Sequence, residues 1–161
     1  MSTVSKHPKG LYFLFFAEMW ERFGYYLMIA LFTQYLEADI TGEGGWGMDM
    51  KHSSSIYGTF IALVFLTPFI GGLLADRKIG YRTSIIAGGI LMGIGYCMIG
   101  IHNLTMFYIS CGLIIIGNGF FKPNISTLLG NLYNDEKYKA NKDSGYNIFY
   151  MGINVGAFIC T

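Results

Sequence analysis

The sequence predicts an all-α membrane protein, and three observations support this prediction. Hydrophobic residues make up 53% of the 161 residues. Charged residues make up only 13%, whereas soluble domains carry about 25%. Three long stretches, 54–75, 83–121 and 144–161, contain no charged residue. Because about 20 apolar residues cross a bilayer as a helix, we expect several spans within residues 1–161.

The lengths of the apolar stretches define the expected helices in order. The first is apolar except for an internal charged cluster. The stretch 83–121 is too long for one span and divides at Ile101–Leu104 into two helices. The last span reaches the final residue, which favours a chain that is part of a longer protein. The expected helices are 11–36, 54–75, 83–101, 104–133 and 144–161.

Basic residues predict the orientation in the membrane. Outside the spans, eight of nine Lys and Arg residues lie on the side of the N-terminus, and only Lys51 lies on the other side. Cytoplasmic loops carry the excess of basic residues, so we expect a cytoplasmic N-terminus. The first external loop is instead acidic, with Asp39, Glu43 and Asp49, and it is flexible because of glycines such as Gly42. The eight basic residues are Lys6, Lys9, Arg77, Lys78, Arg82, Lys137, Lys139 and Lys142.

Several function classes are excluded by composition. A net charge of +1 argues against a nucleic-acid partner. Cys97, Cys111 and Cys160 lie in apolar spans without metal-ligand spacing, so we interpret them as packing residues. No catalytic triad, metal motif or phosphate loop is recognisable. We therefore expect neither an enzyme nor a bound metal.

Four charged residues lie inside the expected spans: Glu18, Glu21, Arg22 and Lys122. Each costs several kcal/mol in hydrocarbon unless it is paired or faces water, so such residues mark substrate or proton pathways. Their formal charges sum to zero. This balance predicts a compensated polar cluster inside a helix bundle.

Five polar residues of the first expected helix share one face, because residues three or four positions apart are neighbours on a helix. They lie roughly 10 to 23 Å into a hydrocarbon core about 30 Å thick, which argues against an interfacial anchor. Two carboxylates beside a cation are suited to exchanging protons: desolvation and repulsion favour the protonated form, and the arginine favours the charged form. The five residues are Glu18, Glu21, Arg22, Tyr25 and Tyr26.

Four motifs carry a resemblance to a known family. Residues 18–26 match the E-x-x-E-R-F-x-Y-Y motif of proton-dependent oligopeptide transporters, a branch of the major facilitator superfamily. Residues 119–124 resemble the family's G-x-x-K-P segment, and residues 149–156 resemble its F-Y-x-x-I-N-x-G signature. Residues 72–82 are similar to the superfamily's G-x-L-A-D-R-x-x-G-x-R loop. Together the motifs span most of the chain.

The resemblance implies an N-terminal portion of a major facilitator superfamily bundle, with four complete helices and a fifth. Members import di- and tripeptides with protons through a cavity between two six-helix halves. The chain would then lie in a plasma membrane, of the bacterial inner-membrane type. It would use protons as the coupling ion, without a cofactor, and would need the absent C-terminal half for transport.

The resemblance also implies roles for individual residues. Arginine offers a fork and lysine a point charge for the peptide carboxylate, and the other half would bind the peptide amine. The residues implied in proton coupling are Glu18, Glu21, Arg22 and Lys122. The residues implied in peptide binding are Arg22, Tyr25, Tyr26, Phe65, Lys122 and Asn154. The residues implied in a cytoplasmic conformational latch are Gly72, Asp76, Arg77, Gly80 and Arg82.

Two positions depart from the family pattern. Gly58 stands where animal members typically have a histidine, which favours proton coupling centred on the first helix. Phe65 replaces a tyrosine that contacts substrate in many members, so the peptide preference stays open. Two alternatives to peptide transport also stay open. One is the same fold carrying nitrate or another small acid, and the other is a membrane-embedded assembly subunit without transport activity.

Overall fold

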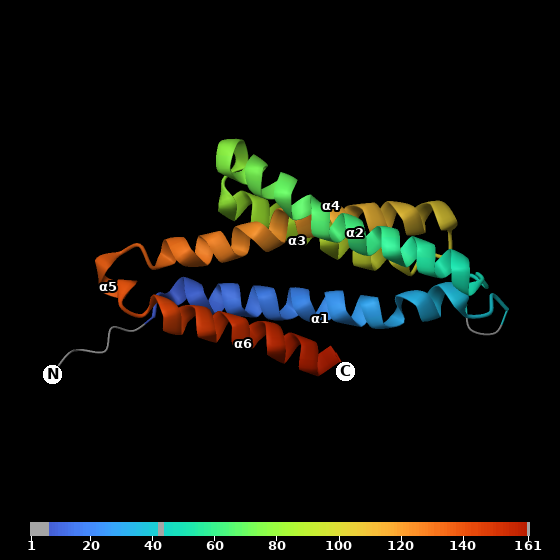
Figure 1. Cartoon of the computed structure of the whole chain (residues 1–161), viewed down its shortest axis with the longest axis horizontal. Coiled ribbons are helices and arrows are strands. Elements are labelled where there is room, and N and C mark those ends of the chain that lie inside the picture. The colour runs from blue at the N-terminus through green and yellow to red at the C-terminus, as the bar shows by residue number, and fades with distance from the viewer. Residues whose placement is uncertain (1–6, 42–43, 161) are drawn as a thin grey trace. The chain divides into compact units, whose positions relative to one another are not determined.

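The computed structural model describes residues 7–41 and 44–160. Lys6, Gly42 and Glu43, used above to predict orientation, and Thr161, the end of the last expected helix, lie outside the described residues. The secondary structure is helical (Figure 1). The elements are α1 (Lys9–Glu37), α2 (Met50–Leu74), the π-helical η1 (Ala75–Ile79), α3 (Tyr81–Ile99), α4 (Leu104–Leu132), α5 (Glu136–Lys139) and α6 (Lys142–Cys160).

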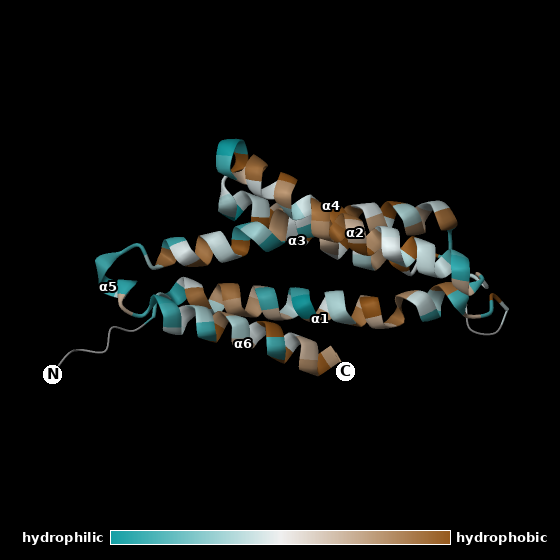
Figure 2. Cartoon of the chain, viewed as in Figure 1, coloured by the Kyte–Doolittle hydropathy of each residue, from teal (hydrophilic) through white to brown (hydrophobic). Residues whose placement is uncertain are grey.

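Within residues 7–41 and 44–160, three segments are long and apolar enough to cross a membrane: Met50–Ile79, Tyr81–Ile99 and Leu104–Leu132. Each overlaps a span expected from the sequence. Figure 2 shows mostly hydrophobic residues along α2 and α4, and a hydrophilic patch in the middle of α1. The chain is therefore a multi-pass helical membrane protein.

The end regions of α2 differ from the sequence-based boundaries. The helix begins at Met50, four residues before the charge-free stretch, because the carboxylate of Asp49 caps it by accepting from the backbone N–H of His52 at 3.3 Å. At its other end, α2 continues into the π-helical turn of η1, where a loop was expected. Gly80 then stops the helix with a φ of 79°, which a residue without a Cβ adopts easily.

The chain divides into two compact units. One comprises Met1–Tyr26 and Ile125–Thr161, and the other comprises Leu27–Asn124. Both α1 and α4 contribute residues to both units.

In the unit Leu27–Asn124, helices α2 and α4 cross at small residues. A Cβ on Gly71 would lie 2.0 Å from the carbonyl oxygen of Gly119. Beside this crossing, the Thr67 hydroxyl donates to the carbonyl oxygen of Ile115 at 3.0 Å. Pro123 has no N–H to donate to the Gly119 carbonyl, so α4 lacks this backbone hydrogen bond beside the crossing. Such small-residue contacts allow membrane helices to pack backbone to backbone.

Helix α3 packs on α4 in the same way. A Cβ on Gly88 would lie 2.6 Å from the carbonyl oxygen of Gly117, and one on Gly95 would lie 2.9 Å from that of Ser110. These positions lie two turns apart on α3, so the two helices stay in close contact over that length. The unit Leu27–Asn124 is therefore held together by backbone contacts at several levels.

Candidate functional site

Three charged residues in the middle of α1 form a compact buried cluster. Glu18, Glu21 and Arg22 are 4%, 7% and 5% exposed. Arg22 Nη2 donates to Glu21 Oε1 at 2.5 Å, and Arg22 Nε donates to Glu21 Oε2, so the guanidinium fork binds both carboxylate oxygens. Glu18 Oε1 lies 3.6 Å from Arg22 Nε. One cation is therefore shared by two carboxylates.

Aromatic residues complete this cluster. The guanidinium carbon of Arg22 lies 4.8 Å from the ring centroid of Tyr25, within cation–π range. Tyr25 is buried and Tyr26 is 37% exposed, with 5.6 Å between the two ring centroids. The cluster thus places an exposed phenol next to a buried one that contacts Arg22.

The charge count of the cluster has a chemical consequence. Two ionised carboxylates and one guanidinium sum to −1, and binding of one proton makes the sum zero. Protonation of either carboxylate changes the charge that Arg22 faces, so proton uptake and the pairing of Arg22 are energetically linked. Among residues 7–41 and 44–160, no three His, Cys, Asp or Glu side chains are grouped to hold a metal ion.

Helix α6 supports the cluster through glycines. A Cβ on Gly156 would lie 2.3 Å from the carbonyl oxygen of Met19 and 3.2 Å from Arg22 Cβ. Gly152 makes the same kind of approach to Phe15, at 3.0 Å from its carbonyl oxygen. Asn154 is exposed and lies between these glycines, about 200° around α6 from each. The glycines face α1, whereas Asn154 is directed elsewhere.

Lys122 and Phe65 contact each other in the unit Leu27–Asn124. Lys122 Nζ lies 5.1 Å from the centroid of the Phe65 ring. Lys122 is half-buried, whereas Phe65 is 64% exposed. The structure therefore groups the predicted residues into two sets, one around Arg22 and one around Lys122. The association of Lys122 with the acidic residues of α1 stays a prediction.

The predicted latch residues lie at the end of α2 and the start of α3. Asp76 and Arg77 are exposed on η1, and Arg82 is exposed in the first turn of α3. Gly72 lies against α4, where a Cβ on this glycine would lie 3.6 Å from Pro123 Cβ, an ordinary van der Waals contact. The exposure of the three charged residues leaves them available for a contact, and the latch itself stays a prediction.

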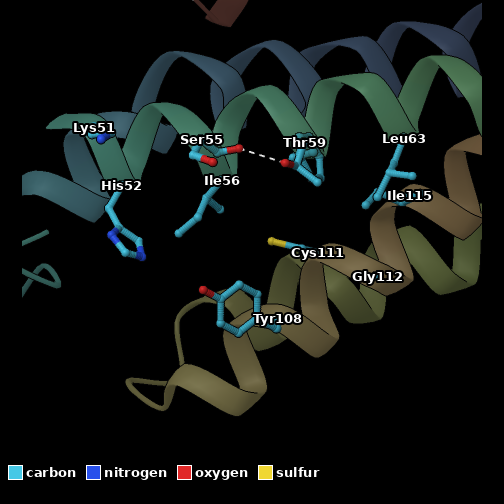
Figure 3. Close-up of a pocket in the computed structure, with 11 residues that line it drawn as sticks. Lys51, His52, Ser55, Ile56, Thr59, Leu63, Tyr108, Cys111, Gly112 and Ile115 are labelled. Carbon is cyan, nitrogen blue, oxygen red and sulfur yellow. Dashed lines mark hydrogen bonds between the residues drawn. The ribbon is translucent and has the colours of Figure 1, made fainter. Parts of the chain in front are cut away.

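A groove of about 720 Å³ lies between α2 and α4 and was not anticipated from the sequence. Figure 3 shows its two walls, with the hydroxyl of Thr59 donating to the Ser55 carbonyl at 2.9 Å. Its walls come from segments about 50 residues apart, so no local pattern could reveal it. The lining residues are Lys51, His52, Ser55, Ile56, Thr59, Phe60, Leu63, Tyr108, Cys111, Gly112 and Ile115.

Comparison with known proteins identifies the family. The profile of the POT family matches residues 82–161. A di-/tripeptide transporter from Lactococcus lactis subsp. lactis is 40% identical over 159 residues, which cover 98% of this chain and 32% of the relative. This chain belongs to the POT family. The resemblance inferred from the four motifs is thereby confirmed.

A second relative and a solved structure are also similar to this chain. The uncharacterized transporter YclF of Bacillus subtilis is 43% identical over 95% of this chain and 31% of its own length. A crystal structure of peptide transporter POT in complex with sulfate has a TM-score of 0.91 and 39% identity, covering 98% of this chain and 32% of that one. The chain therefore spans about a third of the length of the POT relatives it matches.

Proposed function

We propose that this chain is the N-terminal part of a proton-coupled symporter that imports di- and tripeptides by alternating access. The main support is the buried α1 cluster, in which Arg22 is shared between Glu18 and Glu21. In the proposed mechanism, this shared cation couples proton binding to an incoming carboxylate. The name of the Lactococcus lactis relative, a di-/tripeptide transporter, supports the same substrate class.

We further propose that α1 to α4 are four complete spans and that α6 is the fifth. At 1.5 Å per residue, the 29 residues of α1 extend about 43 Å, which exceeds a core about 30 Å thick, and the 19 described residues of α6 extend about 28 Å, close to that thickness. The described basic residues near η1 and α5 then lie on the cytoplasmic side, opposite Lys51. The location is a plasma membrane, with a cytoplasmic N-terminus.

The proposed coupling step is a competition for Arg22. A peptide carboxylate that approaches the guanidinium displaces Glu21 from the fork, because Arg22 has a limited number of donors. Glu21 then binds a proton, which avoids a second buried negative charge. Lys122 supplies the second cation for the carboxylate. Asp76, Arg77 and Arg82 act as the cytoplasmic latch, and the C-terminal half provides its partner and the site for the peptide amine.

The membrane potential acting on one proton is sufficient to accumulate peptide inside the cell. One elementary charge crossing about 100 mV releases about 2.3 kcal/mol. Since about 1.4 kcal/mol corresponds to a tenfold ratio, one proton sustains roughly a fifty-fold gradient of a net-neutral peptide.

The test is uptake of labelled dialanine by the intact protein in proteoliposomes with an inward proton gradient. We expect uptake that collapses with a protonophore and is inhibited by unlabelled dialanine but not by nitrate. Uptake of labelled nitrate in place of labelled dialanine, measured in the same proteoliposomes, would assign the fold to small acids. Absence of uptake of both solutes would favour a membrane subunit without transport activity.

Replacing Arg22 or Lys122 by Ala is expected to weaken dialanine binding. Hydrogen bonds to charged groups contribute about 1.5–3 kcal/mol, which corresponds to about a 10- to 150-fold higher Kd. Isothermal titration of the purified protein measures this change. Lys139→Ala serves as the control, because its ammonium lies in an exposed pair with Glu136 at 3.0 Å. An unchanged Kd in both site variants would contradict the assignment.

A further inference from the structure

The groove between α2 and α4 has a polar end and an apolar end. Figure 3 shows Lys51, His52 and the Tyr108 hydroxyl at one end, and Leu63 and Ile115 at the other. Tyrosine is enriched where lipid headgroups meet the hydrocarbon core, and lysine extends its ammonium to the same level. The groove therefore begins at the headgroup level and continues into the membrane.

The length of the groove matches the thickness of one leaflet. Leu63 follows Lys51 by 12 residues on α2, which corresponds to about 18 Å at 1.5 Å per residue. Half of a hydrocarbon core about 30 Å thick is about 15 Å. A lipid whose headgroup lies beside Lys51 can thus extend an acyl chain along the groove as far as Leu63.

The interior of the groove suits an apolar occupant. A Cβ on Gly112, which lines it, would have no neighbour within 4 Å, so the hollow includes the space beside this glycine. The Thr59 hydroxyl donates to the Ser55 carbonyl of its own helix at 2.9 Å, so this donor is already used. The volume of about 720 Å³ falls in the range of sites that bind small molecules.

The charge at the polar end favours an anionic headgroup. Asp49 Oδ1 lies 3.7 Å from His52 Nδ1, so this carboxylate offsets any positive charge on the imidazole. Lys51, in contrast, has no ion pair within residues 7–41 and 44–160. An exposed lysine at the membrane surface attracts anionic lipids.

The groove is separate from the predicted peptide-binding residues. Phe65 follows Leu63 by two residues, which places the two side chains about 200° apart around α2. Phe60 is buried, lines the groove and stacks on Phe32 of α1, with 5.2 Å between the ring centroids. This part of α1 therefore lies behind the groove, and the open side of the groove faces away from it.

We propose that this groove binds an acyl chain of an anionic phospholipid, with the lipid phosphate at Lys51 and the chain along Ile56, Leu63 and Ile115. The lipid belongs to the leaflet on the side of Lys51, which is the external leaflet in the orientation proposed above. Because the site is separate from the proposed peptide site, lipid binding is measured without transport and is tested independently of the proposed function.

The experiment uses the intact protein in detergent and phosphatidylglycerol that carries a photoreactive diazirine on one acyl chain, followed by peptide mapping. We expect labelling at lining residues such as Ile56 and Ile115, and competition by unlabelled phosphatidylglycerol. Gly112→Leu fills the hollow and displaces about two methylene groups of the lipid, so the same labelling should need roughly tenfold more lipid. Gly93→Leu is the matched control, because Gly93 is exposed on α3 and its Cβ would also have no neighbour within 4 Å.

Lys51→Gln tests the headgroup contact, and its exposed side chain makes this variant compatible with folding even where Gly112→Leu is not. We expect the affinity for phosphatidylglycerol to fall about fivefold, and that for phosphatidylcholine with the same chains to change less than twofold. Equal affinities of the parent protein for both lipids would overturn the headgroup assignment.

Two outcomes would overturn the site itself. Equal labelling of the groove in the parent, Gly112→Leu and Gly93→Leu proteins would show only unselective contact between lipid and exposed apolar residues. A parent protein labelled on other helices but not in the groove would show that another part of the intact protein occupies it.

Discussion

Replacing Glu21 by Gln abolishes proton-driven dipeptide uptake while counterflow exchange continues. Gln has nearly the same shape, and its amide oxygen can still accept one of the two hydrogen bonds that Arg22 donates to Glu21. It cannot bind or release a proton in the transport cycle. Exchange of labelled for unlabelled peptide needs no net proton movement, so it survives. We expect the same separation for Glu18→Gln, whose carboxylate shares Arg22.

Paired assays in proteoliposomes measure this effect: concentrative uptake under a proton gradient, and counterflow with peptide on both sides. Glu136→Gln is the matched control, because Glu136 is an acidic residue in an exposed pair on α5. Uptake at the parental rate in both the Glu18→Gln and Glu21→Gln variants would place proton coupling elsewhere in the protein.

Gly71→Ala strongly destabilises the unit Leu27–Asn124, in which α2 packs against α4. The added methyl would lie 2.0 Å from the Gly119 carbonyl oxygen and 2.5 Å from its carbon, and both are backbone atoms that cannot rotate away. The helices must separate, which also weakens the neighbouring Thr67–Ile115 hydrogen bond. Overpacking of this kind costs about 1–3 kcal/mol, and we expect the upper end here.

Thermal or denaturant unfolding in detergent measures this loss. Gly58→Ala is the matched control, because Gly58 lies on the same helix and its added methyl would have nothing within 4 Å. Removing glycine flexibility there should leave stability unchanged or raise it by about 0.5–1 kcal/mol. Equal behaviour of the two variants would mean that the α2–α4 crossing is looser than the structure indicates.

The apolar stretches predicted five helices because length and composition are local properties, and three of them overlap the described candidate spans in α2, α3 and α4. The sequence did not predict the helix boundaries that capping hydrogen bonds determine. The Asp49 cap extends α2, and Asp135 caps the short α5 by accepting from the backbone N–H of Lys137 at 3.0 Å. The π-helical turn after α2 also had no signal in the apolar pattern.

The candidate site was predictable where it depends on helical spacing. Residues three and four apart brought Glu18, Arg22 and Tyr25 to one face, as expected. Spacing alone would pair Arg22 with Glu18, yet the guanidinium fork binds the adjacent Glu21. The contact of Lys122 with Phe65 depends on how α2 crosses α4, so it required the tertiary structure.

The glycine contacts between α2, α3 and α4 also restrict how the protein can move. Sliding of packed helices past one another requires side chains that can yield by rotating. At Gly71, Gly88 and Gly95 the opposing atoms include main-chain carbonyl oxygens, which cannot yield by rotating. Shear within this trio is therefore sterically blocked. Any rearrangement during a working cycle must carry the three helices along as one rigid block, with hinges outside it.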